Sequence, residues 1–330
     1  MPKSLIVRSE TWPIRGSFRI SREAKSAADV VVVEITEGGV TGRAESVPYP
    51  RYGEAVAGVI ADIERLRSDI ERGLTRTDLQ RRVPAGAARN ALDCALIDLE
   101  AKTSGKSAAD LLGLPAPVPV RTAFTLSLDT PEEMAKAATI AALTYRTIKL
   151  KIAGAGDLER VAAVRSAAPK ARLIADANEG WGVDDLHRLT PELARLGVAL
   201  IEQPLKVGED DALLRFQSPV PLCADESCHT RADLARLVGR YSHINIKLDK
   251  TGGLTEALAL AQEATAAGLK LMIGCMVSTS LSIAPAMLLA RFAEYIDLDG
   301  PLLLARDRTP SLTSTARGDV LYPPPPDLWG

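Results

Sequence analysis

Two lysines at the end of an apolar segment are the first residues of this sequence whose type and spacing could do chemistry. Lys149 and Lys151 lie two positions apart in YRTIKLKI, residues 145–152. Successive side chains of a strand point to opposite faces, so both ammonium groups should share one face. Two like charges aimed the same way cost free energy unless a partner or a reaction uses them. A third lysine, Lys247 in HINIKLDKTGG, also ends an apolar segment.

Three acidic residues end further apolar segments. They are Asp176 in LIADANE, Glu202 in LIEQP and Asp225 in CADES. Three neighbouring carboxylates repel one another unless a cation lies between them, and an all-oxygen set with open positions suits Mg²⁺. The alternative is that each acid caps the helix that follows it. The sequence therefore predicts a magnesium site, with helix capping as the competing interpretation.

The lysines flank the acids, and this order favours proton transfer at one carbon atom. Lys151 comes before the acids and Lys247 after them. A proton next to a carboxylate is very weakly acidic, so a metal ion would have to stabilise the enediolate. A lysine acts as a base when its pKa is lowered, and a neighbouring cation such as Lys149 lowers it. Alternatively, the lysines only form ion pairs with the acids.

The spacing of these polar residues predicts the elements that position them. Polar residues end the apolar segments at positions 151, 176, 202, 225, 247, 275 and 297, at intervals of 22 to 28 residues. Amphipathic stretches such as LERVAAVRSAA lie between the segments. With TAFTLSL in front, eight strand–helix units are expected, as in a (β/α) barrel, whose active sites lie at the carboxyl ends of the strands.

The first 120 residues have a different sequence pattern from the rest of the chain. DVVVVEIT, residues 29–36, is a β-branched run typical of a strand, and apolar spacing predicts helices around residues 54–73 and 86–103. We expect an α+β capping unit at 1–120, a barrel at 121–304 and a proline-rich segment at 305–330 that packs back on the capping unit.

Composition excludes several classes of protein. The 330 residues are 46% hydrophobic and 25% charged, with a net charge of −2 and dispersed Lys and Arg, so we expect no nucleic-acid partner. No apolar run approaches 18 residues, and the first residues lack the apolar core of a signal peptide, so a cytoplasmic protein without a membrane partner is expected. Cys223, Cys228 and His229 match no standard zinc spacing. The composition leaves self-association into a homo-oligomer open.

Five motifs together resemble a known family. KLK, DANE, IEQP, ADES and IKLDKTGG are similar to the muconate-lactonizing subgroup of the enolase superfamily, and YIDLDG resembles its dipeptide epimerases. The resemblance covers nearly the whole chain. It implies a (β/α)7β-type modified TIM barrel with an N-terminal α+β capping domain. It also implies an isomerase that moves the α-proton of the C-terminal residue of a dipeptide, with Ala-Glu from murein peptides as the expected substrate.

The resemblance also assigns roles to particular residues. Lys151 and Lys247 match the bases for the two epimers. Asp176, Glu202 and Asp225 match the ligands of one Mg²⁺ per subunit. Further residues match substrate contacts: Thr125, Lys149, Cys275, Met276, Val277, Asp297 and Asp299.

Two parts of the expected substrate site depend on weaker signals. Asp297 and Asp299 share one face of a strand and suit the α-ammonium group of a dipeptide, although Asp-Gly is also typical of a turn. For the glutamate side chain we expect Arg22, with Lys25 and Arg51 as competitors and solvated surface charge as the alternative. Tyr52 is expected in a second loop over the site.

Other functions stay open at this point. The same fold could epimerise other dipeptides or carry out the elimination of an o-succinylbenzoate synthase, although Asp297 and Asp299 favour an ammonium-bearing substrate. Lys151 or Lys247 could instead form a Schiff base in an aldolase-like barrel. A barrel retained only as a scaffold fits poorly with the complete set of acids and lysines.

Overall fold

The N-terminal part of the chain forms an antiparallel sheet of three strands. The computed structural model describes residues 3–315 and 318–330; residues 1–2 of the expected capping unit and 316–317 of the expected C-terminal segment lie outside the described residues. The strands are β1 (Ser4–Arg19), β2 (Ala24–Glu37) and β3 (Val40–Ser46), in the order β1-β2-β3. The β-branched run predicted as a strand lies in β2, where Val30 to Val33 are all buried. Consecutive buried residues indicate a strand covered on both faces.

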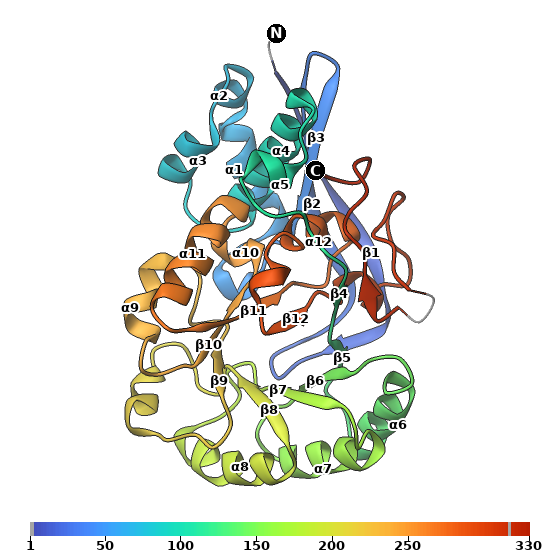
Figure 1. Cartoon of the computed structure of the whole chain (residues 1–330), viewed down its shortest axis with the longest axis vertical. Coiled ribbons are helices and arrows are strands. Elements are labelled where there is room, and N and C mark those ends of the chain that lie inside the picture. Colours follow the sequence, from blue (N-terminus) through green and yellow to red (C-terminus); the bar gives the residue numbers. More distant parts are fainter. Residues whose placement is uncertain (1–2, 316–317) are drawn as a thin grey trace.

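Helices pack against this sheet and complete the capping unit (Figure 1). They are α1 (Val56–Arg65), α2 (Arg67–Glu71), α3 (Arg76–Arg82), α4 (Ala87–Ser104) and α5 (Ala108–Leu111), preceded by the 3₁₀ helix η1 (Pro50–Tyr52). The long helix α4 lies directly on β3. A Cβ atom at Gly42 would come within 2.3 Å of both Ala95 O and Leu99 N, so only glycine permits this approach.

Eight parallel strands form the barrel. Their order is β12-β11-β10-β9-β8-β7-β6-β5, and Ala123 N donates to Ile296 O at 2.8 Å where the two ends of the sheet meet. The strands are β5 (Phe124–Leu126), β6 (Thr147–Lys151), β7 (Arg172–Asp176), β8 (Val198–Glu202), β9 (Leu222–Ala224), β10 (His243–Ile246), β11 (Lys270–Gly274) and β12 (Tyr295–Asp297). The expected α/β fold, a modified TIM barrel beside an N-terminal capping domain, is confirmed.

Helices connect the strands around the outside of the barrel (Figure 1). They are α6 (Pro131–Ala141), α7 (Asp157–Ala167), α8 (Val183–Arg195), η2 (Asp210–Arg215), η3 (Arg231–Asp233), α9 (Leu234–Leu237), α10 (Leu248–Thr251), α11 (Leu254–Ala266), α12 (Ser280–Ala286), η4 (Ala290–Phe292) and α13 (Gly300–Leu303). In the described part of the chain, no helix is long and apolar enough to cross a membrane.

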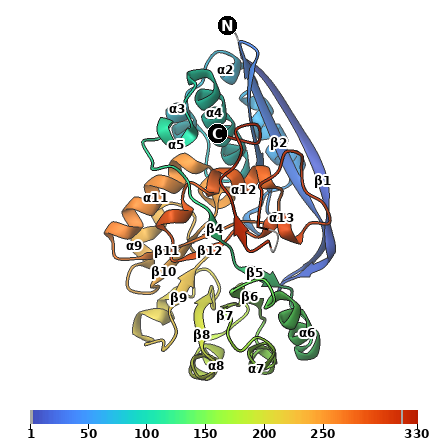
Figure 2. The same ribbon diagram turned by 45° about the vertical axis from the view of Figure 1, so that its right-hand side comes forward.

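The end of the chain returns to the capping unit. Strand β13 (Val320–Leu321) pairs with β4 (Val120–Arg121), the strand that precedes the barrel. Beyond it, Trp329 Nε1 donates to Cys94 O at 3.1 Å, and Gly330 N donates to Asp98 Oδ1 at 2.7 Å. Figure 2 shows this end beside α4 and α5. Residues from both ends of the sequence therefore build one unit.

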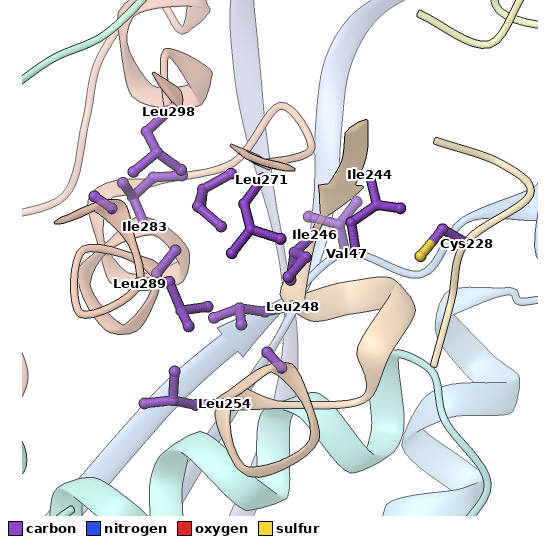
Figure 3. Packing of buried hydrophobic residues seen from close by; sticks show 14 of the residues in the cluster. Val47, Cys228, Ile244, Ile246, Leu248, Leu254, Leu271, Ile283, Leu289 and Leu298 are labelled. Atoms are coloured by element: carbon purple, nitrogen blue, oxygen red, sulfur yellow. The ribbon is translucent and has the colours of Figure 1, made fainter. Parts of the chain in front are cut away.

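The capping unit and the barrel share one apolar core. Val47, which follows β3, belongs to the same buried cluster as Ile246 at the end of β10 and Leu248 at the start of α10 (Figure 3). A partly buried ion pair reinforces the junction, because Glu45 Oε2 lies 2.5 Å from Arg308 NH2 while its Oε1 accepts from Thr279 N at 2.8 Å. The loop after β11 is thereby held against the capping unit.

Candidate active site

A cavity of about 440 Å³ lies at the carboxyl ends of the barrel strands, under the β1–β2 hairpin and the loop at residues 47–56. The hairpin reaches the barrel at its tip, where Leu128 N donates to Arg19 O at 2.9 Å. The structure brings most of the residues expected from the sequence to the cavity wall: Tyr52, Thr125, Lys149, Lys151, Asp225, Lys247, Cys275, Met276, Val277, Asp297 and Asp299. Asp176 and Glu202 lie just beneath this wall, in contact with Lys149.

The two lysines of β6 point to the same side, as their spacing predicts. Lys151 Nζ lies 2.6 Å from Asp176 Oδ2. Lys149 Nζ contacts three carboxylates, at 3.1 Å from Asp176, 2.8 Å from Glu202 and 2.8 Å from Asp297. Burial alone would lower the pKa of Lys149, but these carboxylates raise it well above its ordinary value. The carboxylates therefore favour the charged form of Lys149 at the centre of the site.

Lys247 approaches the acids from the other side. It follows β10 directly, and its Nζ lies 2.6 Å from Asp225 Oδ2. Burial favours a lower pKa, but Asp225 outweighs it and raises the pKa of Lys247. The neighbouring Lys250 donates to Asp225 Oδ1 and to Asn245 O, at 2.6 and 2.8 Å. Asp225 thus has one lysine on each of its oxygens.

The three acids lie on adjacent strands. Asp176 and Glu202 are direct partners in the β7–β8 register, and Asp225 follows β9 by one residue. Burial would raise the pKa of Asp176, yet Lys151 and Lys149 lower it to about 2. Burial, together with the charge of Asp176, raises the pKa of Glu202 to about 7. A shared cation would relieve this repulsion.

The three carboxylates fit a magnesium ion, although in this structure lysine side chains contact their oxygen atoms. Across residues 3–315 and 318–330, no three acidic, histidine or cysteine side chains are already gathered as a metal site. Glu202 Oε2 is buried and lies 2.8 Å from Lys149 Nζ. Asn245 Nδ2 fixes the other oxygen of Glu202 at 2.8 Å. Three carboxylates on neighbouring strand ends are ligands that Mg²⁺ prefers.

A second pair of carboxylates lies at the end of β12. Asp299 Oδ2 accepts from Thr125 N at 2.7 Å, and Thr125 Oγ1 lies 3.5 Å from Asp297 Oδ1. Burial and the neighbouring Asp297 raise the pKa of Asp299 to about 7. Both residues face the cavity, so together they offer negative charge to a cationic group of a ligand.

Arg22, which we expected to bind the substrate side chain, contacts two carboxylates of the barrel loops. It is not among the described residues that line the cavity. Its guanidinium group lies 3.0 Å from Glu179 Oε2 and 2.8 Å from Glu226 Oε1, two buried carboxylates. Lys25 faces the cavity instead, with its Nζ 3.0 Å from Glu23 Oε1 and 4.8 Å from the centre of the Tyr49 ring.

Sequence reasoning missed a group of polar residues that follow the acids. Asn178 and Glu179 come after Asp176, and Glu226 comes after Asp225. Asn178 and Glu179 have φ values of 42° and 66°, in the left-handed region that non-glycine residues rarely adopt. Such strain is concentrated at functional sites. The signal was present in DANE and ADES, where further polar residues follow each expected metal ligand within three positions.

Comparison with known families agrees with the architecture. Residues 132–326 match the family model described as enolase C-terminal domain-like. Residues 3–113 match the N-terminal domain of the mandelate racemase / muconate lactonizing enzyme family. The chain therefore belongs to the mandelate racemase / muconate lactonizing enzyme family of the enolase superfamily.

Two relatives of known name are similar over most of their length. L-Ala-D/L-Glu epimerase of Escherichia coli is 50% identical over 314 residues, covering 95% of this chain and 98% of that protein. N-acetyl-D-glutamate racemase of a Pseudoalteromonas species is 48% identical over 281 residues, covering 84% and 89%. Both names describe isomerases that act on amino acid derivatives.

Solved structures of relatives share the fold throughout. An enolase family member from Agrobacterium tumefaciens, described with bound sodium and L-Ala-L-Glu, has a TM-score of 0.97 and 51% identity over the full length of both chains. Dipeptide epimerase from Enterococcus faecalis, complexed with Mg and L-Leu-L-Tyr, has a TM-score of 0.91 and 31% identity, covering 98% of each chain.

Proposed function

We propose that this protein is a Mg²⁺-dependent dipeptide epimerase that interconverts L-Ala-L-Glu and L-Ala-D-Glu, a reaction suited to the recycling of murein peptides. The observation that carries the proposal is the placement of Lys151 and Lys247. Lys151 ends β6 and Lys247 follows β10, and the strands of the three acids lie between them. Both lysines line the same cavity, and β6 and β10 are four positions apart in the eight-stranded barrel, which puts them on opposite sides of it.

The two lysines act as bases for opposite epimers. Lys151 Nζ takes the α-proton from one face of the C-terminal residue, and Lys247 Nζ delivers a proton to the other face. The roles reverse in the opposite direction, so each lysine serves as base for one epimer and as acid for the other. Epimerisation needs a proton donor and acceptor on opposite faces of one carbon, and this pair supplies both.

Asp176, Glu202 and Asp225 would hold the magnesium ion. The bound ion supplies positive charge that stabilises the negative charge developing on the substrate carboxylate when the α-proton leaves. Lys149, buried between Asp176 and Glu202, adds a second fixed positive charge at the same place. A buried, preorganised cation is worth more there than in water.

The other end of the dipeptide binds at β12. Asp297 and Asp299 receive the α-ammonium group, and Thr125 holds Asp299 in place through its backbone N–H. Residues Cys275, Met276 and Val277 border the same end of the cavity, and we assign them contacts with the peptide backbone of the substrate. The requirement for an ammonium group favours dipeptides over N-acyl amino acids and over the substrate of an o-succinylbenzoate synthase.

Lys25 is the cation that the geometry offers to the glutamate side chain. It lies in the cavity wall at the capping unit, whereas Arg22 is occupied by Glu179 and Glu226. Tyr52 closes the same wall, with its ring 4.5 Å from the His229 ring. Lys25 therefore replaces Arg22 as the residue we assign to substrate carboxylate recognition.

Deuterium exchange tests the proposed function. In D₂O with Mg²⁺, L-Ala-L-Glu should gain one deuterium at the glutamate α-carbon while L-Ala-D-Glu forms, and EDTA should stop both events. N-acetyl-L-glutamate serves as the comparison substrate. Faster racemisation of N-acetyl-L-glutamate than of the dipeptide would contradict the proposal, as would a borohydride-trapped adduct on Lys151 or Lys247.

We also propose that the protein is cytoplasmic. Its self-association into a homo-oligomer stays a prediction. Cys94, Cys223, Cys228 and Cys275 are all free thiols, which supports a reducing compartment. Size-exclusion chromatography with light scattering would establish whether the chain forms a homo-oligomer.

A further inference from the structure

We propose that Glu179 is a positioning residue that fastens both covering segments of the capping unit to the barrel, through Arg22 and Arg51. We call Arg22, Arg51, Glu179 and Glu226 the latch. The kinetic part of this inference rests on the proposed function, whereas the structural part stands independently of it.

The first covering segment is the turn between β1 and β2. Arg22 lies in this turn, and its NH1 donates to Asn178 O at 2.5 Å and to Glu179 Oε2 at 3.0 Å. Its NH2 donates to Glu226 Oε1 at 2.8 Å. Ser21 adds a hydrogen bond from its Oγ to Asn178 O at 3.1 Å. The turn is therefore bound to the loops that follow β7 and β9.

The second covering segment is the 3₁₀ helix η1. Arg51 donates through Nε to Glu179 Oε2 at 2.8 Å and through NH2 to Glu179 Oε1 at 2.7 Å. This is a bidentate arginine–carboxylate pair, the arrangement that best fixes orientation as well as distance. Glu179 Oε1 also accepts from Val207 N at 3.0 Å, which ties its side chain to the barrel. One carboxylate thus anchors both covering segments.

The contacts of the latch stabilise the covering segments on the barrel and can also be broken. Glu179 and Glu226 are buried. If an arginine moved away from them, a buried carboxylate would lose its partner, and this cost opposes opening of the covering segments. The arginine side chains are 26% and 40% exposed, so water can replace one of their contacts. The left-handed backbone at Asn178 and Glu179 aims the Asn178 carbonyl and the Glu179 carboxylate at the same guanidinium group.

The residues next to the latch arginines face the cavity. Glu23 and Lys25 follow Arg22 in the sequence, Tyr52 follows Arg51, and these three side chains line the cavity wall. Fastening the arginines therefore positions the side chains that we assign to substrate recognition. Because both segments share Glu179, they should loosen together when its charge is removed.

Hydrogen exchange followed by mass spectrometry tests the shared anchor. The reporters are the amides of Ile20, which donates to Glu23 O, and of Tyr52, which donates to Tyr49 O. Glu179→Gln should speed exchange about tenfold in peptides covering both segments, since a charge-assisted hydrogen bond becomes a neutral one. Arg22→Gln should affect mainly residues 17–26 and Arg51→Gln mainly residues 47–55.

Glu256→Gln is the matched control, because Glu256 is also a largely buried carboxylate with an arginine partner, Arg231, away from the cavity. It should leave both segments unchanged. If Glu179→Gln alters only one segment or neither, the shared anchor is wrong. Faster exchange throughout the protein would instead indicate general destabilisation and would also overturn the proposal.

Kinetics separate a positioning role from direct substrate contact. Arg22→Gln should raise KM by a similar factor for L-Ala-L-Glu and L-Ala-L-Gln, with a smaller effect on kcat, and Arg22→Lys should restore part of the loss. A rise in KM confined to L-Ala-L-Glu would show that Arg22 binds the substrate carboxylate and would overturn its place in the latch. If the parent enzyme turns over neither dipeptide, the proposed function fails, while the exchange experiment still decides whether the latch exists.

Discussion

Lys151 Nζ lies 2.6 Å from Asp176 Oδ2, and the two residues are direct partners on β6 and β7. A residue assigned as a base and a residue assigned as a metal ligand thus share one contact. The lysine neutralises the acid in this structure, and a cation bound by Asp176 would take over that task. Metal binding and the availability of the base are therefore linked through a single carboxylate oxygen.

The two-base arrangement predicts that the lysine variants lose activity on opposite epimers. The Lys151→Ala variant should incorporate deuterium into one epimer of Ala-Glu about 100 times more slowly or slower still, because a general base usually contributes a factor of that size to the rate. It should keep incorporation into the other epimer, and Lys247→Ala should show the reverse pattern. Proton NMR of each epimer in D₂O gives the measurement. Two variants with the same defect would argue against bases on opposite faces.

Lys25 should determine the preference for an acidic side chain. Lys25→Met should lower kcat/KM for L-Ala-L-Glu about tenfold, near the lower limit for a lost charge-assisted hydrogen bond, because the lysine is about one-third exposed. Turnover of L-Ala-L-Gln should change little. Lys206→Met, at an exposed position away from the cavity, is the control. Equal losses for both dipeptides would remove Lys25 from side-chain recognition.

The carboxylates at β12 predict a pH dependence of substrate binding. Burial and Asp297 raise the pKa of Asp299 to about 7, so Asp299 is protonated below that pH and attracts an ammonium group less strongly. KM for the dipeptide should therefore fall as the pH rises through about 7. It should rise again above about 8, where the substrate α-ammonium group loses its proton. Asp299→Asn should raise KM and remove the acidic limb, and an unchanged limb would assign it to another group.

Asp249 should make the fold less stable as the pH rises. Burial raises its pKa to about 7, although Val47 N and Asn90 Nδ2 donate to its Oδ1. An unfolded aspartate titrates near 4, so between about pH 4 and 7 the folded state binds the extra proton and loses stability as the pH increases. Asp249→Asn keeps the acceptor oxygen and removes the charge. Its gain in unfolding free energy over the parent should be larger at pH 8 than at pH 5, by about 2.5 kcal/mol.

Urea unfolding at the two pH values measures this difference. Asp211→Asn serves as the control, because the Asp211 side chain is 80% exposed. A gain for Asp249→Asn that is equal at both pH values would show that this carboxyl group does not titrate between them.

The fold and the centre of the site follow from local patterns in the sequence. Each barrel strand is a short apolar segment that ends in a polar residue, and parallel strands bring these ends to one face. Asp176, Glu202 and Lys247 were predicted in this way without any knowledge of the pairing between strands. Strand β2 could be predicted equally well from the sequence, because its β-branched run is continuous.

The covering segments could not be placed with the same rules. Arg22 lies in the β1–β2 turn and Lys25, three residues later, lies at the start of β2, and nothing local distinguishes the one that faces the cavity from the one that faces the barrel loops. The difference arises from Glu179 and Glu226, which lie more than 150 residues away and attract the arginine. Long-range ion pairs of this kind depend on the completed fold.

The return of the C-terminus to the capping unit has a consequence for synthesis of the chain on the ribosome. The contacts of Trp329 and Gly330 with α4 form only after these two residues have been translated and have left the exit tunnel. Helix α4 and the three-stranded sheet are therefore incompletely covered while the whole barrel is synthesised. A truncated product would keep every lysine and acid of the site yet lack the segment that seals the unit above it.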